Sequence, residues 1–187
     1  MHHAHIEDGP REANLLGAVS LTVADRVREA VEQGAGQGGS APAALVSLAS
    51  YLDGSPIDSI RGPLGLTHSA TVRVVDRLVD AGLVERREGP DRRSVAVELT
   101  PAGREVAARA AQARAEALEE ALAGLDPGER AELARLNSKV LSTLTDGRAA
   151  AGRICRLCDA HACGHEEGRC PVTRAADAAE ARVAAAP

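Results

Sequence analysis

Aromatic side chains are almost absent from the sequence. It has no Phe, no Trp and a single Tyr, Tyr51, so aromatic residues account for 1% of the chain although hydrophobic residues reach 44%. The core is therefore expected to consist of Leu, Val, Ile and many Ala, a composition that favours closely packed helices. A binding site built on stacking against aromatic rings is not expected.

Long apolar segments are also absent. No window holds the roughly 18 consecutive apolar residues that a membrane-spanning helix needs, so the sequence predicts no membrane partner. The N-terminus lacks the basic segment and apolar run of a secretory signal. Together these absences lead us to expect a cytoplasmic protein.

An overall excess of positive charge is missing as well. The formal net charge is −5, which argues against a basic coat for nucleic acid. The balance varies along the chain, because residues 1–50 hold three Arg against six acidic residues whereas residues 67–94 hold six Arg against five. Positive charge is thus concentrated in the second segment, and for DNA its placement matters more than the total.

The first part of the chain has helical periodicity. Residues 1–10 show no apolar period and are expected to be disordered. A helix is predicted over 11–33, followed by a glycine-rich loop at 33–39 and a second helix with Ser40 as its cap. The apolar positions of the first helix are Leu15, Val19, Val23, Val27 and Val31, and those of the second are Leu45, Leu48, Ala49 and Leu52.

A turn at residues 53–56 is expected to lead into a third, short helix that begins near Ile57. Gly62 and Pro63 fall where that helix would continue, and a proline removes one helical hydrogen bond. The third helix is therefore predicted to be shortened or kinked.

The stretch from Leu64 to Gly103 has the densest pattern. Thr67 is suited to cap an amphipathic helix, and Gly82 is suited to end it in the left-handed conformation. Two strand-like runs separated by a charged turn follow, which predicts a β-hairpin. The apolar face of the helix is expected to carry Val72, Val75, Leu78 and Val79.

This stretch resembles the winged helix-turn-helix of the MarR (multiple antibiotic resistance regulator) family of DNA-binding repressors. The matching motifs are LGLTHSATVRVVDRLVDAGLV at 64–84, DRR at 91–93 and LTPAG at 99–103, and a fainter similarity extends from Leu15 to Leu144. The resemblance implies a mainly α fold with a small β wing, in which helices flank a winged helix-turn-helix and form a homodimer.

The pattern and the resemblance together predict a DNA site. The start of a recognition helix can reach base edges in the major groove, and an arginine-rich wing can contact the backbone or minor groove. By resemblance, Asp91 orients an arginine, for which Arg93 is our choice. The expected DNA-binding residues are Thr67, His68, Ser69, Thr71, Arg73, Arg77, Arg86, Arg87, Asp91, Arg92 and Arg93.

Two more helices are predicted after the wing. Thr100 and Pro101 are suited to begin one that continues to about Gly124, and the sequence DPGE from Asp126 to Glu129 has the pattern of a capping box that opens the next. We therefore predict a MarR-like domain over 11–147, with a DNA-binding core at 40–100 and dimerisation helices at 11–33 and 100–147.

The last segment, 148–187, is expected to form a cysteine-rich extension and a terminal helix that frays. Residues 1–154 contain no cysteine, and the four that the chain has are Cys155, Cys158, Cys163 and Cys170. Four thiolates suit a tetrahedral zinc site, with His161 and His165 as substitute ligands. An iron–sulfur cluster and a reversible disulfide, for instance between Cys155 and Cys163, remain open alternatives.

The sequence thus predicts a homodimeric transcriptional regulator that binds a pseudo-palindromic DNA operator as a repressor. The resemblance implies a small-molecule inducer, and the cysteines suggest a structural staple or a metal or redox sensor. No enzyme is expected, because the chain lacks a phosphate-binding glycine loop, a nucleophile elbow and a zinc-protease motif. The alternatives are a metal-centred redox protein and a dimeric scaffold that does not bind DNA.

Overall fold

The computed structural model describes residues 10–89 and 95–185. The expectation of a disordered segment at 1–10 therefore lies almost wholly outside the described residues. The elements in chain order are α1 Arg11–Ala35, α2 Ala41–Ser47, the π-helix η1 Leu48–Leu52, β1 Ser55–Pro56, α3 Ile57–Leu64, α4 His68–Asp80, β2 Val84–Glu88, β3 Val95–Leu99, α5 Pro101–Ala121, α6 Pro127–Leu144, α7 Arg148–Cys155 and α8 Pro171–Ala184.

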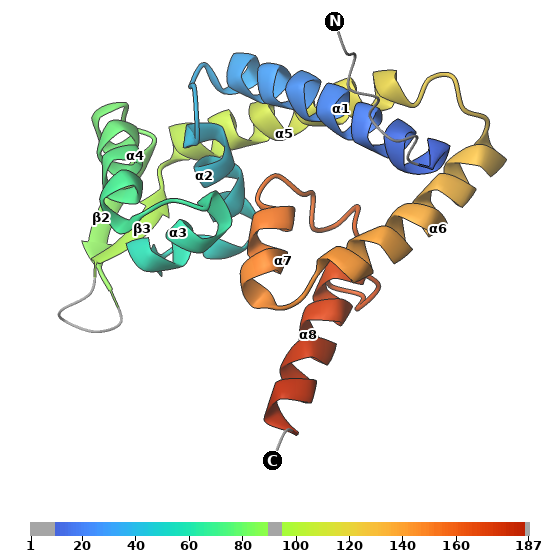
Figure 1. Ribbon diagram of the computed structural model, residues 1–187. Helices are drawn as coiled ribbons and strands as arrows, with labels where there is room; N and C mark the ends of the chain where they lie inside the picture. Colours follow the sequence, from blue (N-terminus) through green and yellow to red (C-terminus); the bar gives the residue numbers. More distant parts are fainter. Residues whose placement is uncertain (1–9, 90–94, 186–187) are drawn as a thin grey trace, which may run out of the picture.

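The fold is mainly helical with one small antiparallel sheet, and the predicted fold class is confirmed (Figure 1). Helices α2, α3 and α4 and the sheet form a winged domain at one end of the long helices α1 and α5. Helix α6 leads away from α5 toward α7 and α8. No helix within the described part of the chain is both long and apolar enough to cross a membrane.

Helices α1 and α5 lie side by side and pack closely (Figure 1). A Cβ atom added to Gly34 would lie 2.9 Å from both the Ala113 Cβ and the Arg109 carbonyl oxygen, so glycine permits this approach. The helix continues through Gly34 and ends at Gly36, whose φ of 61° is left-handed. The loop predicted from residue 33 therefore begins later than expected, because packing against α5 keeps Gly34 helical.

The second helix differs from its prediction. It changes from α-helix to π-helix at Leu48, and a wider turn rotates the following side chains around the axis. Leu45 and Leu48 are buried as expected, whereas Ala49 is exposed. Ser40 occupies the N-cap position but its side chain makes no capping hydrogen bond.

The sheet has the strand order β1–β3–β2. Val84 of β2 pairs with Leu99 of β3, and Ser55 of β1 pairs with Val97 on the other edge of β3. The strand β1 was not predicted, because its residues have the composition of a turn. Asp53 secures this edge, since its carboxylate accepts a hydrogen bond of 2.8 Å from the Leu99 amide.

Local capping follows the sequence closely. The hydroxyls of Thr67 and Thr100 accept hydrogen bonds from the amides of the third residue along, and Asp126 and Glu129 form both halves of a capping box. Pro63 lies inside the last turn of the short helix α3, as expected. Because α5 ends at Ala121, the helix predicted to reach about Gly124 is slightly shorter.

One apolar core joins the winged domain to the adjacent ends of α1 and α5. It is made almost entirely of aliphatic side chains and alanines, in keeping with the composition. Its most deeply buried members come from α2, η1, α3, α4 and the sheet, and they include Leu45, Leu48, Ile60, Leu78, Val75, Val84 and Val97. This core fixes the position of α4.

Residues 148–185 form a C-terminal module of α7, α8 and the turns between them. Helix α7 was not predicted. Helix α8 packs against α6 and buries Val172, Ala176 and Ala179, so only part of its length has the exposure that fraying would require. Arg148 of α7 forms ion pairs with Asp177 and Glu180 of α8, which join the two helices.

Candidate nucleic-acid interface and cysteine cluster

Helix α4 has one face that packs into the core and an opposite face that is exposed. Its buried residues are Thr71, Val74, Val75 and Leu78, whereas Val72 and Val79 are only half-buried. The predicted apolar stripe is therefore rotated slightly, and Val74 rather than Val72 enters the core. The side chains left on the outer face of the helix belong to His68, Ser69, Arg73 and Arg77.

Thr71 does not belong to the outer face. Its side chain is completely buried, and its hydroxyl donates a 3.0 Å hydrogen bond to the carbonyl oxygen of Thr67. A hydroxyl that already satisfies a backbone carbonyl within the core has no access to a duplex. The expectation that Thr71 contacts DNA is therefore wrong, and the residue instead holds the first turn of α4.

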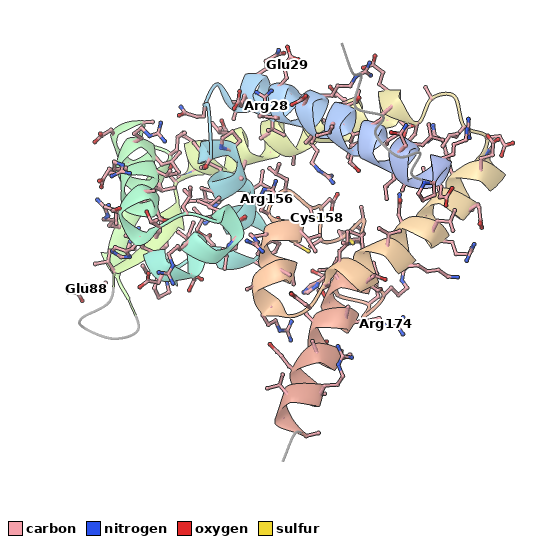
Figure 2. The ribbon with its side chains drawn as sticks, in the orientation of Figure 1. Arg28, Glu29, Glu88, Arg156, Cys158 and Arg174 are labelled. Carbon is pink, nitrogen blue, oxygen red and sulfur yellow. The ribbon has the colours of Figure 1, made fainter. Side chains whose placement is uncertain are left out.

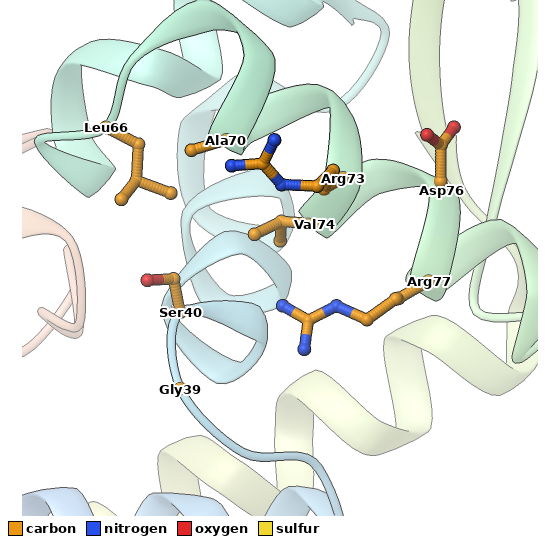
Figure 3. Close-up of a pocket in the computed structure, with 8 residues that line it drawn as sticks. All are labelled: Gly39, Ser40, Leu66, Ala70, Arg73, Val74, Asp76 and Arg77. Carbon is orange, nitrogen blue, oxygen red and sulfur yellow. The ribbon is translucent and has the colours of Figure 1, made fainter.

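Arg73 and Arg77 extend over a hollow of about 680 Å³ beside α4 (Figure 3). Gly39 and Ser40, just before α2, line its other side. Both arginines are exposed, and neither makes an ion pair with another described residue. Two cations one helical turn apart thus stand side by side over a concave surface.

Polar residues at the start of α4 are partly held in place. The His68 Nδ1 atom lies 3.0 Å from the Asp58 carboxylate of α3, and the hydroxyl oxygens of Thr67 and Ser69 are 3.3 Å apart. Thr67, His68 and Ser69 all stay exposed, so they remain accessible at the start of the helix.

The described arginines of the wing are paired within the chain. Arg86 lies 2.5 Å from the Asp76 carboxylate of α4, and Arg87 contacts Glu85 at 2.6 Å and Glu98 at 3.1 Å. Exposed pairs of this kind contribute only about 0–1 kcal/mol, so a phosphate can displace them at small cost. The expected DNA contacts Asp91, Arg92 and Arg93 lie outside the described residues.

All four cysteines line one cavity of about 410 Å³. All are free thiols, and Cys170 is buried while the other three are half-buried. Figure 2 places Cys158 and its neighbour Arg156 in the segment just after α7. His165 also lines the cavity, and its Nδ1 atom is 2.9 Å from the Thr173 hydroxyl, whereas His161 is exposed and not part of the lining.

The thiols interact in a row. The Cys163 thiol donates a hydrogen bond to the Cys170 sulfur at 3.7 Å, and Cys155 and Cys158 lie close enough to influence each other's pKa. Within the described residues, no three Cys, His, Asp or Glu side chains already converge on one point as a metal ion requires. The expected cysteine cluster therefore exists as four neighbouring thiols in a single cavity.

The row of thiols has alternating proton affinities. The hydrogen bond from Cys155 lowers the pKa of Cys158 to about 6 against the effect of burial, and the charge of Arg114 acts in the same direction. The same hydrogen bond and burial raise the pKa of Cys155. Burial raises the pKa of Cys163 to about 12. Cys158 is thus the thiol most readily converted to the thiolate form.

The C-terminal module contacts the winged domain through polar residues for which the sequence analysis predicted no such role. The Tyr51 hydroxyl of η1 donates a hydrogen bond to the Cys155 carbonyl, and the Ser47 hydroxyl donates one of 3.0 Å to the Arg156 carbonyl. Burial, followed by the neighbouring thiols, raises the pKa of Tyr51, which keeps its hydroxyl protonated as a donor. The only feature of the sequence that could have drawn attention to this contact is that Tyr51 is the single aromatic residue.

Comparisons with known proteins agree with this geometry. Residues 64–94 match the model of the MarR family. No curated protein matches the chain in sequence. Among solved structures, apo MarR from E. coli is 26% identical with a TM-score of 0.57 over 72% of this chain and 99% of its own. Rv2887 of Mycobacterium tuberculosis, solved in complex with DNA, is 25% identical with a TM-score of 0.57, and the match covers 71% of this chain and 98% of Rv2887. CouR of Rhodococcus jostii RHA1, solved with bound p-coumaroyl-CoA, is 24% identical with a TM-score of 0.58, and the match covers 71% of this chain and 91% of CouR.

Proposed function

We propose that the protein is a DNA-binding repressor of the MarR family that acts as a homodimer, because residues 64–94 match the family model and the fold matches that of MarR from E. coli. The observation that carries this proposal is the outer face of α4, where Arg73 and Arg77 stand exposed over a hollow. A similar protein, Rv2887, has been solved in complex with DNA.

The geometry of α4 suits the major groove. Its capped N-terminal end displays Thr67, His68 and Ser69, whose hydroxyl and imidazole groups can hydrogen-bond to base edges or phosphates. Arg73 lies one turn further along and is the residue that we assign to guanine recognition. We assign Arg77, near the end of the helix, to a backbone phosphate, where charge rather than fork geometry matters.

Unsatisfied apolar surface supports the dimer. Helix α6 has no fully buried residue, and the N-terminal half of α1 is exposed throughout. Large hydrophobic side chains in contiguous positions are unusual on the surface of a monomer, and a second copy of the chain would cover them. The exposed large hydrophobic residues of these two helices are Leu15, Leu16, Val19, Leu21, Leu136, Val140 and Leu144.

Two-fold symmetry of the dimer would place two copies of α4 on half-sites about one helical turn apart, which makes the proposed operator pseudo-palindromic. A small-molecule inducer is part of the proposal, supported by the structure of CouR with p-coumaroyl-CoA, a protein with the same fold. The inducer of this chain would act by changing the separation of the two α4 helices.

The DNA-binding surface can be tested with Arg73→Ala and Arg77→Ala on duplex DNA from the region upstream of the protein's own gene. We expect Arg73→Ala to weaken binding of the dimer by about 1–3 kcal/mol for each half-site and to relax sequence preference. We expect Arg77→Ala to weaken binding to all sequences and to reduce the salt slope of the dimer by about 2, because each protomer loses one phosphate contact. Fluorescence anisotropy over a range of salt concentrations measures both effects.

Arg182→Ala is the matched control, because Arg182 is an exposed arginine on α8, far from α4 (Figure 1). It should bind DNA as the native protein does. Native affinity and salt slope in both α4 variants would contradict the proposal and would favour a dimeric scaffold without DNA-binding activity.

A further inference from the structure

The segment between α7 and α8 has no regular secondary structure and almost no core of its own, although turn hydrogen bonds link its backbone. It runs from Arg156 to Arg169, forms turns rather than a helix or strand, and buries few side chains. Gly164 and Gly168 have φ of 69° and 67°, so the backbone folds back on itself twice. A short segment of this kind lacks the core and backbone ladders that ordinarily specify one conformation.

The four thiols come from the end of α7, from the turn segment and from the position just before α8. Cys155 closes α7, Cys158 and Cys163 belong to the turns, and Cys170 immediately precedes α8. All four line the same cavity although they lie in different local structures. The fold therefore brings every cysteine of the chain to one place.

We propose that Cys155, Cys158, Cys163 and Cys170 bind one zinc ion, and that the ion fixes the turn segment to α7 and α8. Zinc favours four thiolates in a closed tetrahedron, and such sites supply folding free energy to small segments. This inference does not depend on DNA binding.

One edge of that tetrahedron is already formed. A zinc–sulfur bond of about 2.3 Å implies about 3.8 Å between two sulfur ligands, and the Sγ atoms of Cys163 and Cys170 are 3.7 Å apart. In a four-iron cluster each thiolate binds a different iron atom, which separates the sulfur atoms further. The observed spacing therefore fits two thiolates on one metal ion and disfavours a four-iron cluster.

Zinc binding replaces the S–H groups of the cysteines with zinc–sulfur bonds. Four thiols and one Zn²⁺ give a tetrathiolate centre and four protons, with no oxidation or reduction. The S–H group through which Cys163 contacts Cys170 is lost as metal–sulfur bonds form, so both sulfur atoms can turn toward the ion.

The site is positioned against the DNA-binding domain. Tyr51 and Ser47 hold the carbonyls of Cys155 and Arg156, and the side chain of Leu157 packs against the core of the winged domain. Gly152 of α7 lies against Pro63 of α3, since a Cβ atom there would be 3.4 Å from the proline ring. A zinc ion at the cysteines would therefore stiffen a module that touches both η1 and α3.

The first experiment measures metal in the purified full-length protein. We expect about one zinc ion per chain, and replacement by cobalt should give the intense visible bands of a tetrahedral thiolate site. The double variant Cys158→Ser/Cys163→Ser should lose the metal, whereas His161→Ala and His165→Ala should retain it. Retention of zinc by the double variant would overturn the proposal, and so would a metal-free native protein.

The alternative centre gives a different result in the same sample. An iron–sulfur cluster would show iron, acid-labile sulfide and visible absorption without added cobalt, and that outcome would overturn the assignment to zinc. If the His165→Ala variant lost its metal, His165 would be a ligand in place of one cysteine. That outcome would overturn the four-thiolate assignment.

A second experiment tests what the ion holds together. Arg156 and Arg169 lie at the two ends of the turn segment and are exposed, so trypsin can cut at both. We expect zinc-loaded protein to resist cleavage there and chelator-treated protein to be cut at least about tenfold faster, because opening of the segment limits cleavage. Equal rates would refute the structural role. Neither experiment uses DNA, so failure here is separate from failure of the proposed repressor function.

Discussion

Gly103→Ala is expected to cost the domain about 3 kcal/mol or more of its free energy of unfolding. A Cβ atom at this position would lie 1.9 Å from the carbonyl oxygen of Leu83, which is backbone and cannot rotate away. That carbonyl already accepts a hydrogen bond from the Thr100 amide. Overpacking of a core ordinarily costs about 1–3 kcal/mol, and a clash with fixed backbone belongs at the upper end or beyond.

The position joins three elements, which explains why no adjustment is available. The Gly103 amide donates to the Thr100 hydroxyl at 3.0 Å, and that hydroxyl donates to the Gly82 carbonyl at 2.8 Å. The start of α5 is thus tied to the segment that leads from α4 into β2. Moving α5 outward to admit a methyl group would break these contacts together.

Urea denaturation followed by circular dichroism measures the effect as a lower midpoint. Gly17→Ala is the matched control, because Gly17 is also helical but a Cβ atom there would meet nothing within 4 Å. We expect that substitution to be neutral or to stabilise the helix by up to about 1 kcal/mol. Equal midpoints for the two variants would contradict the close approach at Gly103.

Val140→Glu is expected to convert the protein to monomers and to lower its affinity for a two-half-site operator by about 100-fold or more. Val140 lies between Leu136 and Leu144 on an apolar stripe of α6 and is 38% exposed in the protomer. A carboxylate in the proposed interface would be desolvated without a partner. A monomer also loses the gain that comes from binding two linked half-sites together.

The substitution should leave the protomer folded, since Val140 takes no part in its core. Ser142→Glu is the matched control, because Ser142 is an exposed residue of α6 that helical spacing places on the opposite side from Val140. Analytical ultracentrifugation should find the control dimeric and Val140→Glu monomeric. A dimeric Val140→Glu protein with native operator affinity would place the interface elsewhere.

The sequence predicted best what is governed by local hydrogen bonds and by periodicity. Caps at Thr67, Thr100 and Asp126 were identified correctly because each depends on residues no more than three positions away. Helix α4 and the hairpin were located for the same reason, with the resemblance to a known family as further support.

What the sequence could not predict depends on contacts between distant segments. The π-helical turn at Leu48–Leu52 and the strand β1 follow from packing and pairing with the rest of the domain. Thr71 was assigned to DNA because its side chain is polar, yet its hydroxyl is satisfied inside the helix, where a threonine packs like valine. The docking of Tyr51 on Cys155 joins residues 104 positions apart, which no periodicity reveals.

The scarcity of aromatic residues has a practical consequence. Since the chain contains no tryptophan, its intrinsic ultraviolet emission comes from Tyr51 alone. That phenol is hydrogen-bonded to a carbonyl and lies beside two thiols, and such surroundings quench tyrosine emission. Detachment of the C-terminal module from the π-helix η1 should therefore increase the fluorescence intensity of Tyr51. The tyrosine fluorescence of the unlabelled protein thus reports on this contact.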